Sequence, residues 1–255
     1  MAAVAGIFAI SGFAILALVA AYPDVPEDAL LRSLPGLLAG SMASSTALIL
    51  TLLLVVRPLE PAYLRLLPGW ETGRTLAVMV VGMLALGQAL DSLTALVGLG
   101  DRGSMALIRH ALASARGPDL FGAVVVVGLL AGSAEEIFFR GYMQTRLRAF
   151  WPAPAAVAVT TVCFAGLHVD PSAIHVVLAA ALSVYLGFVT ETSGSTLPAL
   201  GCHVVNNVVF TLQTALGGTV VDRATNATLA VGCALTFVAC VVWLRRTRPP
   251  SAAAV

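Results

Sequence analysis

The sequence carries very little charge, and this scarcity indicates the solvent for which the chain is built. Only 11% of its 255 residues are charged, 59% are hydrophobic, and the mean hydropathy is +0.95. A soluble domain of this size carries about 25% charged residues. Lysine is absent, so all 14 basic residues are arginine. The formal net charge of +1 excludes a protein that binds nucleic acid through bulk electrostatics.

Several motifs that would indicate a phosphate-binding site or a zinc site are also absent. The chain has no Gly-rich phosphate loop, no paired-cysteine zinc motif and no compact HExxH helix. It has no internal repeat of the kind expected for an alternating-access transporter. The four cysteines lie inside apolar runs, which predicts reduced packing residues rather than a disulfide framework.

Long apolar runs are what the sequence does contain. A helix needs about 20 apolar residues to cross a bilayer, and we predict an all-α transmembrane bundle of about eight spans with a polar active-site cavity inside the membrane. The predicted spans are Val4–Tyr22, Leu34–Val56, Thr75–Leu99, Phe121–Phe150, Ala153–Val169, Ala173–Thr190, Thr196–Leu216 and Leu229–Leu244.

Flanking charges predict how the bundle sits in the membrane. No basic residue precedes the first apolar run, so we interpret it as a transmembrane helix and not as a cleaved signal. The sequence "RRTR" follows the last predicted span directly, which predicts a cytoplasmic C-terminus by the positive-inside rule. The usage of alanine and arginine favours a bacterial protein, and hence the bacterial plasma membrane.

The polar motifs divide the chain into three predicted parts. Residues 1–118 hold N-terminal transmembrane helices and amphipathic connectors, 119–216 form a catalytic core, and 217–255 hold the last helix and the tail. One connector, "GSMALIRHALASARG", places its apolar residues at helical spacing with Arg109 and Arg116 on another face. This pattern predicts a helix that lies in the membrane interface, with His110 at its surface.

Ionisable groups within the apolar runs are few, and each is costly in a bilayer unless it is paired or serves a function. Glu136 and Arg140 are four residues apart with the acid nearer the helix N-terminus, so we predict that they form an ion pair. Glu135 then has no local cation and is a candidate general base. The alternative is that both glutamates only form hydrogen bonds with polar groups of neighbouring helices.

Two histidines on other spans complete the candidate site. His168 closes one predicted span, and His203 lies four residues before Asn207, so that this pair projects from one helical face. Each has a structural alternative, either a helix-end histidine or polar contacts between helices. We interpret the three remaining intramembrane polar residues as structural: Asp91, His175 and Asn206.

The combination is more informative than any single residue. One acid pair and two histidines on three apolar spans are enough to hold a metal-bound water or to activate a water without metal. An amide such as that of Asn207 can stabilise an oxyanion. Hydrolysis of a peptide bond inside the membrane is the chemistry that fits this set best.

The order of these residues resembles that of a known family. "EEIFFR" (Glu135, Glu136, Arg140) is similar to an EExxxR motif, "FAGLH" (ending at His168) to FxxxH, and "HVVNN" (His203, Asn207) to HxxxN. This ordered trio is found in the CPBP family of intramembrane proteases, which includes type II CAAX prenyl endopeptidases and bacteriocin-processing or immunity relatives. The resemblance extends from about Leu120 to Leu216.

The resemblance implies a role for each motif residue. Glu135 activates water, His168 orients that water or ligates a metal, and Glu136 with Arg140 holds the site together. His203 and Asn207 bind the oxyanion; in the metal-dependent version Glu135, His168 and His203 ligate a divalent ion, for which zinc is the first choice. The implied substrate is a membrane-embedded or lipid-anchored peptide.

Two other functions are compatible with the same residues. A non-catalytic membrane scaffold or bacteriocin-immunity protein could keep the fold and bind a membrane partner. A small transporter could use Glu135, His168 and His203 as a proton relay, although the missing repeat disfavours it.

Overall fold

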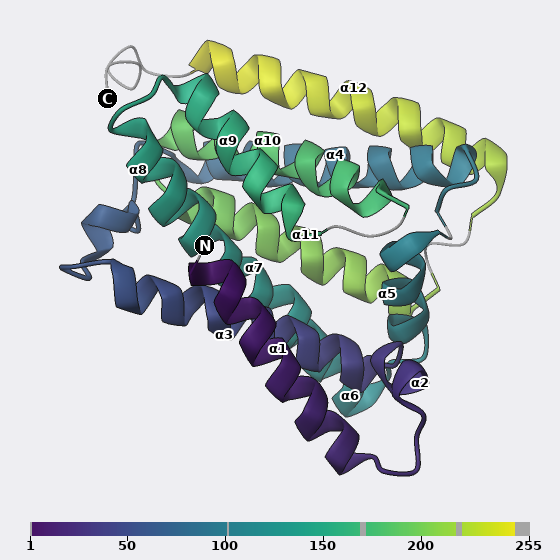
Figure 1. Cartoon of the computed structure of the whole chain (residues 1–255). Helices are drawn as coiled ribbons and strands as arrows, with labels where there is room; N and C mark the ends of the chain where they lie inside the picture. Colours follow the sequence, from purple (N-terminus) through teal and green to yellow (C-terminus); the bar gives the residue numbers. More distant parts are fainter. Residues whose placement is uncertain (1, 101, 169–171, 218–220, 248–255) are drawn as a thin grey trace.

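The computed structural model describes residues 2–100, 102–168, 172–217 and 221–247, and the regular structure in these ranges is helical, as the sequence predicts. Figure 1 shows the helices packed as a bundle. The elements are α1 (Ala2–Ala21), α2 (Glu27–Leu31), α3 (Leu34–Val55), η1 (Pro61–Leu64), α4 (Gly73–Leu96), α5 (Gly103–Ala113), α6 (Gly117–Ala123), η2 (Val124–Ala131), α7 (Gly132–Glu136), η3 (Ile137–Gln144), α8 (Thr145–Arg148), α9 (Ala153–Gly166), α10 (Ile174–Ser193), α11 (Leu197–Ala215) and α12 (Arg223–Thr247).

Six helices within the described residues are long and apolar enough to cross a membrane. They are α1, α3, α4, the continuous segment Gly117–Arg148, α10 and α12. These helices identify an integral membrane protein.

The predicted count of eight spans is not confirmed, because α9 and α11 fall outside this set of six. The span predicted at Ala153–Val169 is a helix of 14 residues that ends at Gly166, and Val169 lies outside the described residues. Such a helix is about 21 Å long, shorter than a hydrocarbon core of about 30 Å. The span predicted at Thr196–Leu216 is α11, which has 19 residues and owes its lower hydropathy to the polar side chains that it carries.

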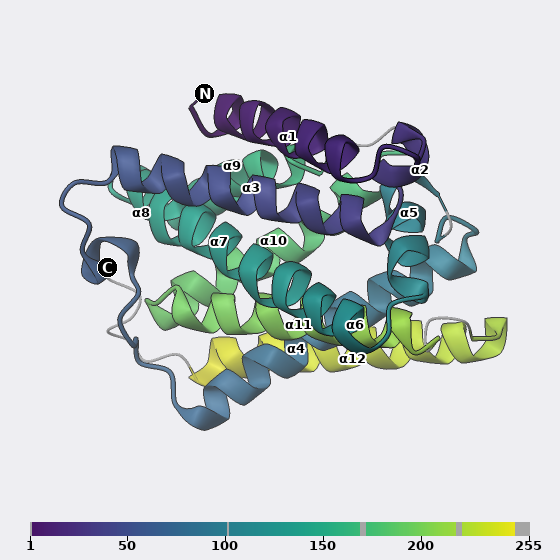
Figure 2. The same ribbon diagram turned by 90° about the horizontal axis from the view of Figure 1, so that it is seen from below.

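The outer helices pack in pairs. α12 lies along α4, and α1 lies along α3, as both Figure 1 and Figure 2 show. The side chains of Phe8, Phe13 and Leu16 on α1 are exposed in the isolated chain. A continuous apolar surface of this kind is stable when lipid covers it.

The segment Gly117–Arg148 carries the first motif and has an irregular helical geometry. It begins and ends as α-helix, but its π-helical stretches η2 and η3 flank the short α7 that bears both glutamates. The wider π turn changes which side chains share a helical face, and such turns occur frequently at functional sites. α-Helical periodicity alone therefore could not give the orientation of every side chain in this segment.

The connector between α3 and α4 is tied to the turn between α10 and α11. The Thr196 hydroxyl donates to the Leu64 carbonyl at 3.0 Å, and the Trp70 indole donates to the Thr192 carbonyl. Gly194 ends α10 in the left-handed region, with φ of 75°. This turn holds α10 and α11 side by side and so positions His203.

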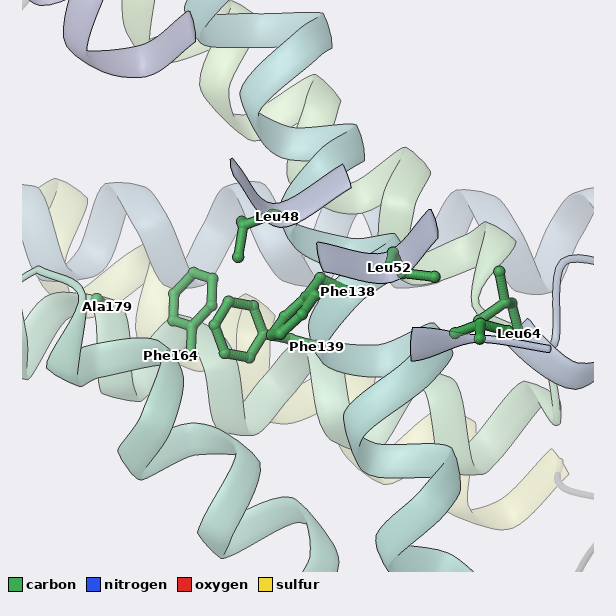
Figure 3. Close-up of a cluster of buried hydrophobic side chains, with 8 residues drawn as sticks. Leu48, Leu52, Leu64, Phe138, Phe139, Phe164 and Ala179 are labelled. Carbon is green, nitrogen blue, oxygen red and sulfur yellow. The ribbon is translucent and has the colours of Figure 1, made fainter. Parts of the chain in front are cut away.

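An apolar cluster supports the motif residues from one side. Leu48 and Leu52 of α3 pack against Phe138 and Phe139 of η3 and Phe164 of α9, as drawn in Figure 3. The Phe139 and Phe164 rings meet edge to face with centroids 5.2 Å apart. This packing fixes the position of Phe164, which also contacts the polar residues described below.

Candidate active site

The Glu136–Arg140 ion pair lies at the centre of the bundle. Arg140 Nη1 donates to Glu136 Oε1 at 2.7 Å, and both side chains are 0% exposed, which confirms the pairing predicted from their four-residue spacing. Arg140 Nη2 donates to the Ser183 carbonyl at 3.1 Å and to the Ser183 hydroxyl at 2.7 Å, and that hydroxyl donates to Thr161 at 3.2 Å. The arginine therefore joins η3 to α10 and α9.

His203 of α11 lies between the two glutamates. Its Nδ1 is 2.7 Å from Glu136 Oε1, and its Nε2 is 3.7 Å from Glu135 Oε2. Because Glu136 is paired with Arg140, its carboxylate accepts, and Nδ1 of the imidazole carries the hydrogen. Glu136 thus fixes both the ring orientation of His203 and the proton on Nδ1, while Nε2 faces Glu135.

Two glycines allow α11 to come this close to the helix that carries the glutamates. A Cβ atom at Gly128 would lie 2.7 Å from Val208 Cγ2, and one at Gly132 would lie 3.4 Å from the backbone nitrogen of Val204. Small residues at a helix contact let two backbones approach within a membrane. The close approach brings His203 within hydrogen-bonding distance of Glu136.

A cavity of about 920 Å³ opens beside this cluster, and Glu135, His168, His203 and Asn207 all line it. Glu136 and Arg140 do not belong to its lining. The two adjacent glutamates therefore have different surroundings. Glu136 is bound within the protein, whereas Glu135 lines the cavity.

His168 and His203 both contact the ring of Phe164. The Phe164 ring centroid is 4.8 Å from that of His168 and 6.0 Å from that of His203. His168 Nδ1 is 2.9 Å from the Phe164 carbonyl, which can only accept, so the hydrogen is on Nδ1. Nε2 is then the nitrogen with which a neutral His168 can accept a proton or bind another group.

His175 lies closer to the candidate site than its interpretation as a structural residue suggests. It lines the same cavity, and its ring centroid is 4.7 Å from that of His168. Its Nδ1 is 2.8 Å from the Ser104 hydroxyl of α5. The start of α10 and the helix α5 thus meet beside His168.

Asn207 is held by the segment that bears the glutamates. Its Nδ2 donates to the Val127 carbonyl at 3.2 Å, which leaves the second hydrogen of the same amide for another acceptor. Asn206 approaches α4, where its Oδ1 would lie 2.6 Å from a Cβ atom at Gly87. This contact agrees with the interpretation of Asn206 as a residue between helices.

Sequence reasoning missed the partner of Asp91. The carboxylate of Asp91 on α4 is bound by the guanidinium of Arg109 on α5, and Arg109 also lies 5.8 Å from the Phe210 ring centroid. We expected Arg109 on the polar face of an interfacial helix. The only available signal was that an intramembrane carboxylate requires a cation, which does not indicate which of the arginines supplies it.

The predicted metal ligands are not gathered into a metal-binding group. Within the described ranges, no set of three or more His, Cys, Asp and Glu side chains is placed to hold a metal ion. Glu135 and His203 are neighbours, but His203 already donates from Nδ1 to Glu136, and the ring of His168 packs against Phe164. The three-ligand centre formed by Glu135, His168 and His203 therefore stays a prediction.

Fold and site together define a class: a polytopic helical membrane protein with a buried acid–arginine pair, and a histidine and a second acid beside a cavity. In a comparison with protein families, residues 117–209 match the model described as type II CAAX prenyl endopeptidase Rce1-like. The match confirms the resemblance to the CPBP family that the three motifs indicate, and that description names an endopeptidase, which is a hydrolase. No curated protein and no solved structure matches the chain.

Proposed function

We propose that the protein is an intramembrane endopeptidase in which Glu135 activates the attacking water. One observation carries this proposal: His203 is oriented through Nδ1 by Glu136, and its Nε2 faces Glu135 at 3.7 Å on the wall of the cavity. At this separation one water can contact both groups, since catalytic hydrogen bonds span about 2.6–3.2 Å. The family match supports the same class of reaction.

The proposed reaction transfers protons through Glu135. Its carboxylate takes one proton from the water, and the hydroxide adds to the peptide carbonyl carbon. The carbon–nitrogen bond then breaks, the leaving nitrogen takes the proton from Glu135, and the carboxylate is restored. The products are one peptide with a new carboxyl group and one with a new amine.

The negative charge that develops on the carbonyl oxygen requires donors in the cavity. The second amide hydrogen of Asn207 is one, since the first is used on Val127. His203 lines the same cavity, but the hydrogen of its neutral ring is on Nδ1 and is used on Glu136, so its Nε2 donates to the oxyanion only when the ring is protonated. His168, which lines the same cavity, is proposed to orient the water or the substrate.

A metal-dependent version of the reaction is the second form of this proposal, and it rests on the family resemblance alone. Zinc bound by Glu135, His168 and His203 would supply a water of lowered pKa. It would require these ligands to move into a common coordination sphere. Removal of metal ions by chelation tests this version directly.

The substrate class that we propose is a membrane-embedded or lipid-anchored peptide. Glu135 and His203 lie on helices within a bundle of membrane-spanning segments, so a substrate bond must be presented within or close to the bilayer. We further propose that the protein resides in the bacterial plasma membrane with its C-terminus in the cytoplasm, and that residues 119–216 form its catalytic core.

The test is cleavage by the purified protein in lipid nanodiscs. Membrane-anchored peptides of varied sequence are incubated with the wild type and with Glu135→Gln, and the products are identified by mass spectrometry. Cleavage by the wild type alone supports the proposal. A wild type that binds a membrane protein specifically, without cleaving any peptide in the set, would favour the scaffold or immunity function instead.

A further inference from the structure

A second cavity lies at one end of the bundle, away from the paired glutamates. It has a volume of about 1390 Å³ and is formed by α2, α5, the end of α11 and the start of α12. These elements lie together at the right of Figure 1, where α12 begins. Because several spanning helices begin or end there, the cavity is at the level of a membrane surface and not at the bilayer centre.

The lining of this cavity is strongly basic. Four arginines and one histidine line it, whereas Asp28 is the only acid in its lining among the described residues. The basic residues are Arg32, Arg109, His110, Arg116 and Arg223. Nearly a third of the arginines of the chain therefore surround one cavity.

Most of this positive charge is not neutralised within the protein. Arg109 is bound by Asp91, but Arg32, Arg116 and Arg223 form no ion pair in the part of the chain that the structure describes. Arg116 is held in place through Nη1, which donates to the carbonyls of Ala113 and Ala115. Like charges gathered around a cavity repel one another unless an anion binds between them.

Apolar side chains stand beside the arginines. Leu107, Leu216 and Val221 also line the cavity, and all three are exposed in the isolated chain. A site for a soluble anion needs no such neighbours, whereas a lipid presents a charged headgroup and apolar chains together. Guanidinium groups bind phosphate oxygens with two parallel hydrogen bonds, which an ammonium group cannot do.

We propose that this cavity binds an anionic phospholipid, with the headgroup phosphate between Arg32, Arg116 and Arg223 and the acyl chains against Leu107, Leu216 and Val221. Basic pockets between transmembrane helices bind anionic headgroups in this way. The proposal does not depend on the protease activity, because it concerns a different cavity and none of the motif residues lines it.

The experiment measures lipid binding to the full chain by native mass spectrometry. The wild type is titrated in detergent with phosphatidylglycerol, with phosphatidylcholine and with inorganic phosphate as the soluble competitor. The test variant is Arg32→Gln with Arg223→Gln. The matched control is Arg146→Gln with Arg246→Gln, because the side chains of these arginines are exposed and have no described contact, and Arg246 lies at the opposite end of α12 from Arg223.

We expect the wild type to retain phosphatidylglycerol but not phosphatidylcholine, and the test variant to bind phosphatidylglycerol about 25-fold more weakly, at roughly a factor of five for each arginine. The control variant should bind like the wild type, and all three proteins should unfold at the same temperature. Equal affinity of the test variant and the wild type would overturn the proposal. An equal loss of lipid affinity in the test and control variants would overturn it as well, because it would indicate diffuse electrostatic attraction. Full displacement of the lipid by millimolar phosphate would also overturn it, because it would indicate a site for soluble phosphate.

Discussion

Replacement of Arg140 by methionine should destabilise the protein strongly, because it leaves a fully buried carboxylate without its cation. Methionine keeps most of the side-chain length, but the bonds to Glu136 and to both oxygens of Ser183 are lost. Removal of one partner of a buried ion pair costs about 3–5 kcal/mol. Neutralising the acid as well, in the double variant Glu136→Gln with Arg140→Met, should recover about 2 kcal/mol of that loss or more, since no uncompensated charge is then buried.

The free energy of unfolding is measured in mixed micelles with increasing dodecyl sulfate. Arg146→Met is the matched control, because the side chain of Arg146 is exposed and has no described contact, and it should change the free energy of unfolding by less than about 0.5 kcal/mol. A loss below about 1 kcal/mol for Arg140→Met would show that the ion pair does not hold the helices together. A double variant less stable than the single one would contradict the explanation by an unpaired charge.

The remaining predictions concern activity and orientation. Glu135→Gln should abolish cleavage while leaving the unfolding midpoint unchanged, because Glu135 faces the cavity and its neighbour carries the structural ion pair; a large loss of stability would contradict this division. Ser104→Ala should lower kcat by roughly threefold to tenfold with KM unchanged, because the Ser104 hydroxyl contacts His175 beside His168 and a lost hydrogen bond costs about 1 kcal/mol. Ser104→Thr keeps the hydroxyl and should restore the rate. A change confined to KM would argue against a positioning effect. Cleavage after exhaustive chelation should persist if the water is activated without metal, whereas activity that disappears and returns with zinc would support the metal-dependent version. A reporter that works only in the cytoplasm should be active when it is fused after the tail, and a reporter that works only in the periplasm should be inactive there. The opposite result would reverse the predicted orientation.

The sequence alone was sufficient for the features that depend on spacing within one helix. The pairing of Glu136 with Arg140 follows from four-residue periodicity, and the membrane class follows from apolar runs of sufficient length. The short helix α9 shows the limit, because an apolar run does not reveal that a helix ends after 14 residues. Hydropathy records composition and not the point at which the backbone leaves the helix.

Contacts between helices could not be predicted in the same way. The bond from His203 to Glu136 depends on two glycines that let α11 approach, and the bond from Arg140 to Ser183 depends on the position of α10. The spacing of residues along the chain does not reveal that His203 contacts Glu136 or that Arg140 contacts Ser183. Serine and threonine side chains within apolar helices often form hydrogen bonds with such buried groups. They limit the number of possible partners, but the sequence does not show which of them is the partner.

The central claim is that a water activated by Glu135 cleaves a peptide bond in the membrane. The most direct measurement is cleavage of a membrane-anchored peptide in water enriched in oxygen-18, with the wild type and Glu135→Gln in identical nanodiscs. We predict that the wild-type product carries one heavy oxygen in its new carboxyl group and that Glu135→Gln yields no product. Cleavage by Glu135→Gln at the wild-type rate, or a wild-type product without the heavy oxygen, would contradict the claim.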